Sequence, residues 1–246
     1  MEYRSWGEER RPLVVLLHAL GCHSGWWQWV ADGLATQFRV VAPDLRGHGD
    51  SRWAEDYSFV AYAADVEELV QGLGGGPYLL AGHSMGGYLG LVIANRNICP
   101  PSALLVADMK TGATEQELAD LRAASARPVR SYASLEEAVG RYRLAPPEHV
   151  VSSERLAAVV RECYRQQPEG AWVEKFDRRA LAIDPVVPFD LVGGLKCPVT
   201  FVRGERSVVM PAEPAAALAA KAGARLVELP GCIITCPWRR LRAWIP

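Results

Sequence analysis

The sequence has 246 residues, of which 50% are hydrophobic and 22% are charged, and its formal net charge is −1. This balance is typical of a globular protein with a substantial core, and the small net charge argues against a nucleic-acid partner. Residues 1–13 lack the apolar stretch of a signal peptide, and no run approaches the roughly 20 apolar residues of a membrane span. We therefore expect a cytoplasmic protein with no role at a membrane. Its irregularly spaced cysteines predict neither a disulfide framework nor a zinc site.

Short apolar segments alternate with amphipathic ones through the first hundred residues. The apolar segments are predicted strands, at residues 12–17, 38–43, 77–82 and 103–107. The amphipathic segments are predicted helices, at residues 25–37, 59–74 and 85–94. Strands that are apolar along their whole length and alternate with helices predict a mostly parallel sheet that is covered by helices on both faces.

The pattern changes after Asp108 and returns near residue 198. Residues 110–185 are poor in strand signals and carry charged helical patterns at 114–126, 134–143 and 152–166. The earlier alternation then resumes, with a strand at 198–203, an alanine-rich helix at 212–222 and a strand at 224–229. We predict a core of residues 1–109 and 186–246, and a helical cap of residues 110–185 inserted after the sixth strand. Such a cap would lie over the carboxyl edge of the sheet, where α/β folds bind ligands.

The strongest chemical signal is the sequence G-H-S-M-G-G at residues 82–87, directly after a predicted strand and before a predicted helix. A serine on such a sharp turn needs small neighbours, because the helix must approach the strand closely. The turn would lift the hydroxyl of Ser84 above the edge of the sheet. It would also direct the backbone N–H of Met85 toward a developing oxyanion. We predict that Ser84 is a nucleophile.

Two further motifs follow the first and second long strands. In H-A-L-G, at residues 18–21, the N–H of Leu20 is the candidate for the second oxyanion donor. We count His18 among the substrate-binding residues and expect it to orient this loop rather than to act as a base. In the polar, glycine-rich residues 44–51, we expect a scaffold for the edge of the site rather than direct catalysis by Asp44 or His48.

The three motifs, H-x-x-G, D-x-R-G-x-G-x-S and G-H-S-M-G-G, occur in the order found in the α/β-hydrolase superfamily. The chain resembles this superfamily from residue 3 to the region of residue 231, and it is most similar to small cap-bearing esterases and C–C hydrolases. The resemblance implies an α/β-hydrolase fold with a triad of serine, acid and histidine in that chain order. It also implies chemistry that needs neither a metal nor a cofactor.

The acid of the implied triad has two candidates. Family members usually carry it in the turn after the strand at 198–203, but here that turn reads G-E-R-S-V at residues 204–208 and contains no aspartate. Some members take the acid from the end of the preceding strand, where this sequence has Asp108. A carboxylate at either strand tip can accept the Nδ1–H of the same histidine. We favour Asp108 over Glu205 or the absence of an acid.

The histidine of the triad is missing from its expected place. The resemblance puts it after the turn at Pro230 and Gly231, but residues 232–246 contain no histidine. The histidines of the chain lie elsewhere, at positions 18, 23, 48, 83 and 149. Without a base the Ser84 hydroxyl stays protonated near neutral pH and is a poor nucleophile. We do not expect His149 to replace the base, because it lies in a polar turn far in sequence from any strand tip.

A shifted reading frame would explain the tail. If residues 233–242 are encoded by GC-rich codons, a frame that begins one base upstream yields His-His-His-Leu-Pro-Leu-Glu-Ala-Pro-Glu. We hypothesise a frameshift here, and the alternative is a natural tail on a protein without triad chemistry. The short tail also predicts an exposed apolar strip where a longer C-terminal helix would pack, and hence marginal stability or self-association into a homo-oligomer.

The cap offers candidates for substrate binding, and Trp172 is the one we select. Its aromatic and basic companions could line an acyl or aryl pocket and grip a carboxylate: Tyr132, Tyr142, Phe176, Arg130, Arg141, Arg143 and Lys175. Plain packing within the cap is the alternative that we prefer. The leading functional prediction is a serine hydrolase that cleaves a small-molecule carboxylic ester or thioester through an acyl-serine intermediate. The alternatives are a C–C bond hydrolase of the same fold and a non-catalytic binding protein.

Overall fold

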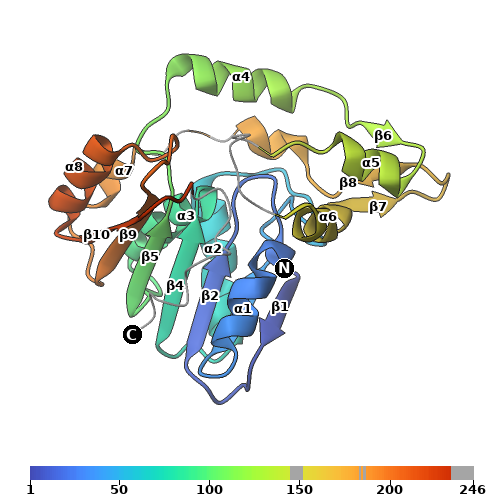
Figure 1. Ribbon diagram of the computed structural model, residues 1–246. Helices are drawn as coiled ribbons and strands as arrows, with labels where there is room; N and C mark the ends of the chain where they lie inside the picture. Colours follow the sequence, from blue (N-terminus) through green and yellow to red (C-terminus); the bar gives the residue numbers. More distant parts are fainter. Residues whose placement is uncertain (145–151, 183, 185–186, 234–246) are drawn as a thin grey trace.

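The computed structural model describes residues 1–144, 152–182, 184 and 187–233. Within them, the central element is a seven-stranded sheet with the strand order β1-β3-β2-β4-β5-β9-β10 (Figure 1). Its strands are β1 (Tyr3–Trp6), β2 (Leu13–Leu17), β3 (Arg39–Pro43), β4 (Tyr78–His83), β5 (Ala103–Ala107), β9 (Val199–Gly204) and β10 (Arg225–Leu229). Only β1 runs antiparallel to its neighbour. The predicted, mostly parallel sheet is confirmed.

Helices cover both faces of the sheet, as the alternating pattern predicts. They are the short 3-10 helix η1 (Ser24–Trp27), α1 (Gln28–Leu34), α2 (Phe59–Gly72), α3 (Met85–Arg96), α7 (Pro188–Leu191) and α8 (Ala212–Ala222). Val14 and Leu16 of β2 pack with α1, whereas Val15 and Leu17 face the cluster that contains α2, α3 and α8. Successive side chains of a strand point to opposite faces, so one apolar strand serves both layers.

The N-terminal strand β1 was not predicted. Its side chains alternate between exposed and half-buried positions, so Tyr3–Trp6 carries no apolar run. The strand pairs with β3 at the edge of the sheet, where one side of the backbone needs no partner strand.

The segment between β5 and β9, residues 110–185, forms an insertion that is less purely helical than predicted. It contains α4 (Glu115–Ser125), β6 (Ser131–Tyr132), α5 (Leu135–Arg141), α6 (Ser153–Arg161), β7 (Tyr164–Gln166), β8 (Trp172–Glu174) and the 3-10 helix η2 (Arg178–Ala182). The strands form a small sheet in the order β6-β8-β7. The insertion follows β5, which is the fifth strand in chain order. The expected position after a sixth strand is therefore wrong, because only one strand, β1, precedes β2.

The predicted helix over 152–166 ends at Arg161 because its last part pairs with β8 instead. Gly170 has a φ of +90°, and its amide donates a hydrogen bond to the Gln167 carbonyl. This turn folds the chain back and places Tyr164–Gln166 beside Trp172–Glu174 in antiparallel register. Pairing with a strand that is distant from the helical pattern thus overrides that pattern.

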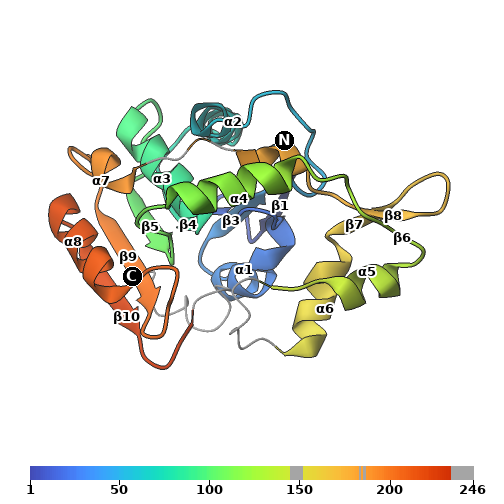
Figure 2. The ribbon, with the colours of Figure 1, turned by 90° about the horizontal axis from the view of Figure 1, so that it is seen from above.

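The insertion lies across the carboxyl ends of the core strands (Figures 1 and 2). Two hydrogen bonds tie it to loops that follow β2 and β3. The Nε2–H of His23 donates to the Val159 carbonyl of α6, and the Asp177 amide donates to the Gly47 carbonyl. In the view from above, α4 crosses over the strands (Figure 2).

In the part of the chain that the structure describes, no helix is both long and apolar enough to cross a bilayer.

Candidate active site

Ser84 occupies the turn between β4 and α3 in a strained backbone conformation. Its φ is +51°, a region that non-glycine residues rarely adopt. The Ser84 amide donates a 3.0 Å hydrogen bond to the carbonyl of Ala107, the last residue of β5. The side chain is half-buried. The turn therefore presents the Ser84 hydroxyl at the tips of β4 and β5.

Two glycines of the motif allow this turn because the backbone passes too close for a side chain. A Cβ on Gly82 would lie 2.0 Å from the Gly86 carbonyl oxygen. A Cβ on Gly86 would lie 2.2 Å from the carbonyl oxygen of Leu17, at the end of β2. The start of α3 thus rests directly against the end of β2, as the spacing of the motif predicts.

The two predicted oxyanion donors lie on these touching elements. Met85 is the first residue of α3, and Leu20 belongs to the loop that follows β2. Among the described residues, neither backbone N–H donates a hydrogen bond to another group. Within the described part of the chain, both amides are therefore unpaired, at the edge that carries Ser84.

His18 lies beneath the Leu20 loop rather than on its surface. The ring is 1% exposed; Nε2 accepts from the Leu45 amide at 3.0 Å, and Nδ1 lies 2.8 Å from the Ala19 carbonyl. Burial lowers the pKa of His18 to about 4, so the ring is neutral. With both nitrogens engaged, His18 fits the predicted role of orienting the loop, and a direct substrate contact does not fit this geometry.

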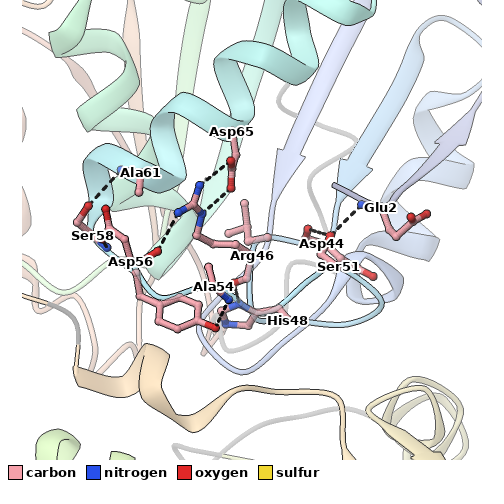
Figure 3. Close-up of polar contacts among 12 residues, drawn as sticks. Glu2, Asp44, Arg46, His48, Ser51, Ala54, Asp56, Ser58, Ala61 and Asp65 are labelled. Carbon is pink, nitrogen blue, oxygen red and sulfur yellow. Dashed lines mark hydrogen bonds and ion pairs between the residues drawn. The ribbon is translucent and has the colours of Figure 1, made fainter.

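The loop of residues 44–51 is held by its own polar side chains (Figure 3). Asp44 accepts hydrogen bonds from the amides of Ser24 and Asp50, at 2.6 and 2.8 Å. Burial acts to raise the pKa of Asp44, but these two donors lower it overall. Arg46 makes a two-pronged ion pair with Asp65 of α2, with both distances 2.6 Å. This arrangement matches the scaffold that we predicted.

His48 is also positioned as part of the scaffold. It is fully buried, its Nδ1 lies 2.9 Å from the Arg46 carbonyl, and its ring centroid is 5.0 Å from that of His18. Burial lowers the pKa of His48 to about 3. Its Nε2 is buried and has no hydrogen-bond partner among the described residues.

Asp108 is a buried carboxylate at the tip of β5. It is 1% exposed, its φ is +46°, and its amide donates to the Val202 carbonyl of β9. Neither carboxylate oxygen has a hydrogen-bond partner among the described residues. Burial raises the pKa of Asp108 from 3.8 to about 7, although the nearby Ser207 hydroxyl and Arg203 guanidinium act in the opposite direction. An unpartnered buried carboxylate is costly, so its presence calls for a functional explanation.

Glu205, the other acid candidate, has a different environment. Its side chain is exposed, and it accepts a 2.6 Å hydrogen bond from the Gly231 amide. The adjacent Arg206 amide donates to the Cys232 carbonyl. Glu205 thus links the turn after β9 to the loop after β10. Its side chain remains exposed to solvent, unlike that of Asp108.

The described histidines do not complete a triad. His18 and His48 belong to the scaffold, while His23 bonds to Val159 in the insertion. His83 is the last residue of β4 and is 8% exposed. None of the four donates to the Asp108 carboxylate. His149 and the tail whose frame we question, from residue 234 onward, lie outside the described residues.

A pocket of about 180 Å³ lies between the core and the insertion, beside the Leu20 loop. Its core wall is formed by Gly21, Cys22, His23 and Gly49. Its insertion wall is formed by Tyr142, Cys163, Tyr164, Glu174, Lys175 and Phe176. The sequence predicts Tyr142, Lys175 and Phe176 as candidate pocket residues but not Tyr164, because its position lies within the helical pattern over 152–166.

Trp172, our substrate-binding candidate, does not line this pocket. It pairs with Tyr132 across β6 and β8 and packs in the insertion's own apolar cluster around Ala138 and Val160. Trp172 therefore fits the alternative of packing within the insertion. Within the described part of the chain, no cluster of three or more His, Cys, Asp or Glu side chains could hold a metal ion.

Curated relatives match part of the chain in sequence. Epoxide hydrolase 3 of Xenopus tropicalis is 37% identical over 39% of this chain and 27% of its own length. Protein phosphatase methylesterase 1 of Bos taurus is 34% identical over 56% of this chain and 38% of its own length. The chain therefore spans well under half of these curated relatives.

Solved structures match nearly the whole chain. A thioesterase domain from the curacin biosynthetic pathway superposes with a TM-score of 0.79 and 27% identity, over 93% of this chain and 87% of that domain. An esterase from M. tuberculosis has a TM-score of 0.80 and 22% identity, over 98% of this chain and 84% of the esterase, which shows the shared fold. The sequence profile of the alpha/beta hydrolase family matches residues 14–232. The chain thus has the fold and the sequence pattern of one family of hydrolases, and it belongs to the alpha/beta hydrolase family.

Proposed function

We propose that the chain is a serine hydrolase that cleaves a small carboxylic ester or thioester through an acyl-Ser84 intermediate. The observation that carries this proposal is the strained Ser84 turn, with two amides unpaired within the described residues and the buried Asp108 carboxylate at the same edge of the sheet. Strain at a nucleophile and an unpartnered buried acid both cost stability, and catalysis is a reason to keep them.

The chemistry follows from these positions. The Ser84 hydroxyl attacks the ester carbonyl carbon while a histidine accepts its proton. The N–H groups of Leu20 and Met85 donate to the resulting oxyanion. Collapse expels the alcohol or thiol, which takes the proton from histidine, and a water molecule then hydrolyses the acyl-serine by the same route. Asp108 accepts the Nδ1–H of the histidine and fixes its orientation.

The position of Cys232 supports a histidine from the C-terminal loop. The Arg206 amide donates to the Cys232 carbonyl, and the next residue, Ser207, lies beside Asp108. Residue 233 therefore follows directly on a loop that is held against the Asp108 region. In the alternative reading frame, position 233 is a histidine.

The ester or thioester class is favoured by two of the proteins that the chain resembles. One is a methylesterase, and the other is a thioesterase domain that matches over 93% of this chain. We further propose that residues 110–185 act as a cap over this site. A C–C bond hydrolase remains an alternative within the same fold, and turnover of a vinylogous diketone but not of simple esters would favour it.

A second candidate is a binding protein without catalysis. The specific observation in its favour is that no described histidine bonds to Asp108. It predicts ligand binding without turnover, both in the chain as given and after any repair of the tail.

Hydrolysis of p-nitrophenyl acetate and butyrate tests the proposal. We would compare the chain as given, the chain with the histidine-bearing frame restored after Cys232, and the restored chain with Ser84→Ala. We expect turnover only in the restored chain with Ser84, and a loss of about 10³-fold or more on removing the nucleophile. Equal rates in all three would contradict the proposal. Sequencing the gene across these codons tests the frameshift directly.

A further inference from the structure

The pocket between the core and the insertion has the size and position of a substrate subsite. Its core wall begins at Gly21, the residue directly after the candidate oxyanion donor Leu20. Its volume is about 180 Å³. An apolar cavity of about 150 Å³ is enough to hold benzene, so this pocket has room for one aromatic ring with a short substituent.

Three aromatic side chains wall the pocket and are themselves held in place. Tyr164 is 4% exposed and packs edge-on against Tyr132. Phe176 lies against the buried ring of His48, with 4.8 Å between centroids, and Tyr142 lies 6.5 Å from Trp26. Rigid aromatic walls favour a flat, apolar ligand body, because little side-chain entropy is lost on binding.

Lys175 is the one lysine or arginine among the residues that line this pocket. Its side chain is only 17% exposed, and its amide donates to the Cys163 carbonyl at 2.7 Å, which fixes the residue at the wall. Its ammonium pairs with Asp50 at 2.7 Å, but Asp50 is 62% exposed. An ion pair with such an exposed partner is weak, so a ligand carboxylate could displace Asp50.

The other titratable groups of the pocket do not oppose an anion strongly. The Glu174 carboxylate lies 3.5 Å from Arg178, which balances its charge. His23 is neutral, because burial lowers its pKa and its Nδ1 accepts from the Gly25 amide. Burial raises the pKa of the Cys163 thiol, which keeps it uncharged.

We propose that this pocket binds a carboxylate carried on an aromatic ring, with Lys175 exchanging Asp50 for the ligand. Together with the proposed function, on which this part rests, the pocket defines the substrate as an ester or thioester with an aryl carboxylate at the end remote from the reacting carbonyl. Lys175 is then a specificity-determining residue.

Equilibrium binding tests the pocket without requiring turnover. The probes are benzoate and its neutral analogue benzamide, titrated into the full chain by calorimetry at low salt. We expect the acid to bind about tenfold more tightly than the amide, because only the acid brings a negative charge that pairs with the Lys175 ammonium. Lys175→Met should abolish this preference and Lys175→Arg should retain it. Asp50→Asn should increase it, because the ammonium is then unpaired.

The control is Lys196→Met, at an exposed lysine outside the pocket, which should leave the preference unchanged. Equal binding of acid and amide to the unmodified chain, or a preference that survives Lys175→Met, overturns the proposal. Its failure is separable from that of the proposed function. Lysine-dependent acid binding without esterase activity in the restored chain leaves the pocket standing, whereas esterase activity without acid preference leaves only the hydrolase standing.

Discussion

The candidate site has two sides that are built in different ways. The nucleophile side comprises Ser84, Met85 and the Leu20 loop; the acid–base side comprises Asp108, the turn after β9 and the loop after β10. On the nucleophile side, the contacts that hold the turn and the loop all lie within the described residues. Gly86 packs against the end of β2, and the His18 side chain links the Leu20 loop to the Leu45 amide. On the acid–base side, the buried Asp108 carboxylate has no partner there.

The difference shows how each side depends on the rest of the chain. The nucleophile turn needs only neighbouring strands and small residues, so a change in a distant segment leaves it intact. Under the proposed function, the acid–base side also needs a histidine from the C-terminal end of the chain. A change in the tail would then remove the base and leave the Ser84 turn in place.

The largest expected effect distinguishes the two acids in a chain with the restored histidine. Asp108→Asn should lower kcat for p-nitrophenyl butyrate by about 10³- to 10⁴-fold, because the histidine loses the partner that sets its tautomer. Initial rates on purified variants measure this. Glu205→Gln is the matched control, and we expect it to lower kcat by less than about tenfold, because Glu205 is exposed and bonds to Gly231. The reverse order would assign the acid to Glu205.

Gly86→Ala should destabilise the folded protein by disturbing the packing of α3 on β2. Its Cβ would lie 2.2 Å from the Leu17 carbonyl oxygen, so α3 must move away from β2. We expect the free energy of unfolding, measured in urea, to fall by about 3 kcal/mol or more. Gly72→Ala in α2 is the control, since a Cβ there meets no atom within 4 Å. That variant should be neutral or stabilised by up to about 1 kcal/mol, and equal losses in both variants would contradict the packing argument.

The buried acid should give the chain a specific dependence of stability on pH. The pKa of Asp108 is raised by burial from 3.8 to about 7, so the folded state holds a proton that the unfolded state releases across this range. Stability from this group is therefore present below pH 4 and is lost as the pH rises through 7. Relative to Asp108→Asn, the unfolding free energy should fall by on the order of 2 to 4 kcal/mol between pH 4 and pH 8. A difference that is flat with pH would show that Asp108 has a partner in solution.

The smallest effect concerns the scaffold behind the Leu20 loop. Arg46 and Asp65 form their two-pronged pair with side chains only 20% and 25% exposed. A double-mutant cycle with Arg46→Met and Asp65→Asn should give a coupling energy of about 1 kcal/mol by urea denaturation. A coupling near zero would remove this pair from the forces that hold the loop.

The sequence predicts the core well because its signals there are local. Apolar runs mark the strands that are buried on both faces, and the small residues around Ser84 mark the turn. The same local character explains the scaffold prediction for residues 44–51, where Asp44 and Ser51 bond within one loop.

Features that depend on pairing between distant segments were missed. The strand Tyr164–Gln166 lay within a helical pattern, and only its partner Trp172–Glu174 makes it a strand. Trp172 was selected for its residue type, but its position in β8 turns it toward the insertion's own core. The sequence named Lys175 only as one of several cations, and its place at the pocket depends on contacts with Cys163 and Asp50.

The attachment of the insertion to the core has a consequence for kinetics. The Val159 carbonyl accepts from His23, and the Gly47 carbonyl accepts from Asp177, whose carboxylate also accepts from Tyr57. The insertion therefore cannot swing away from the strand tips without breaking these two bonds, which both lie in its second half. Each such opening would expose the Asp177 amide to solvent, so the hydrogen-exchange rate of this amide reports how often the insertion opens. Comparing that rate with turnover would reveal whether product escape waits for the insertion to lift.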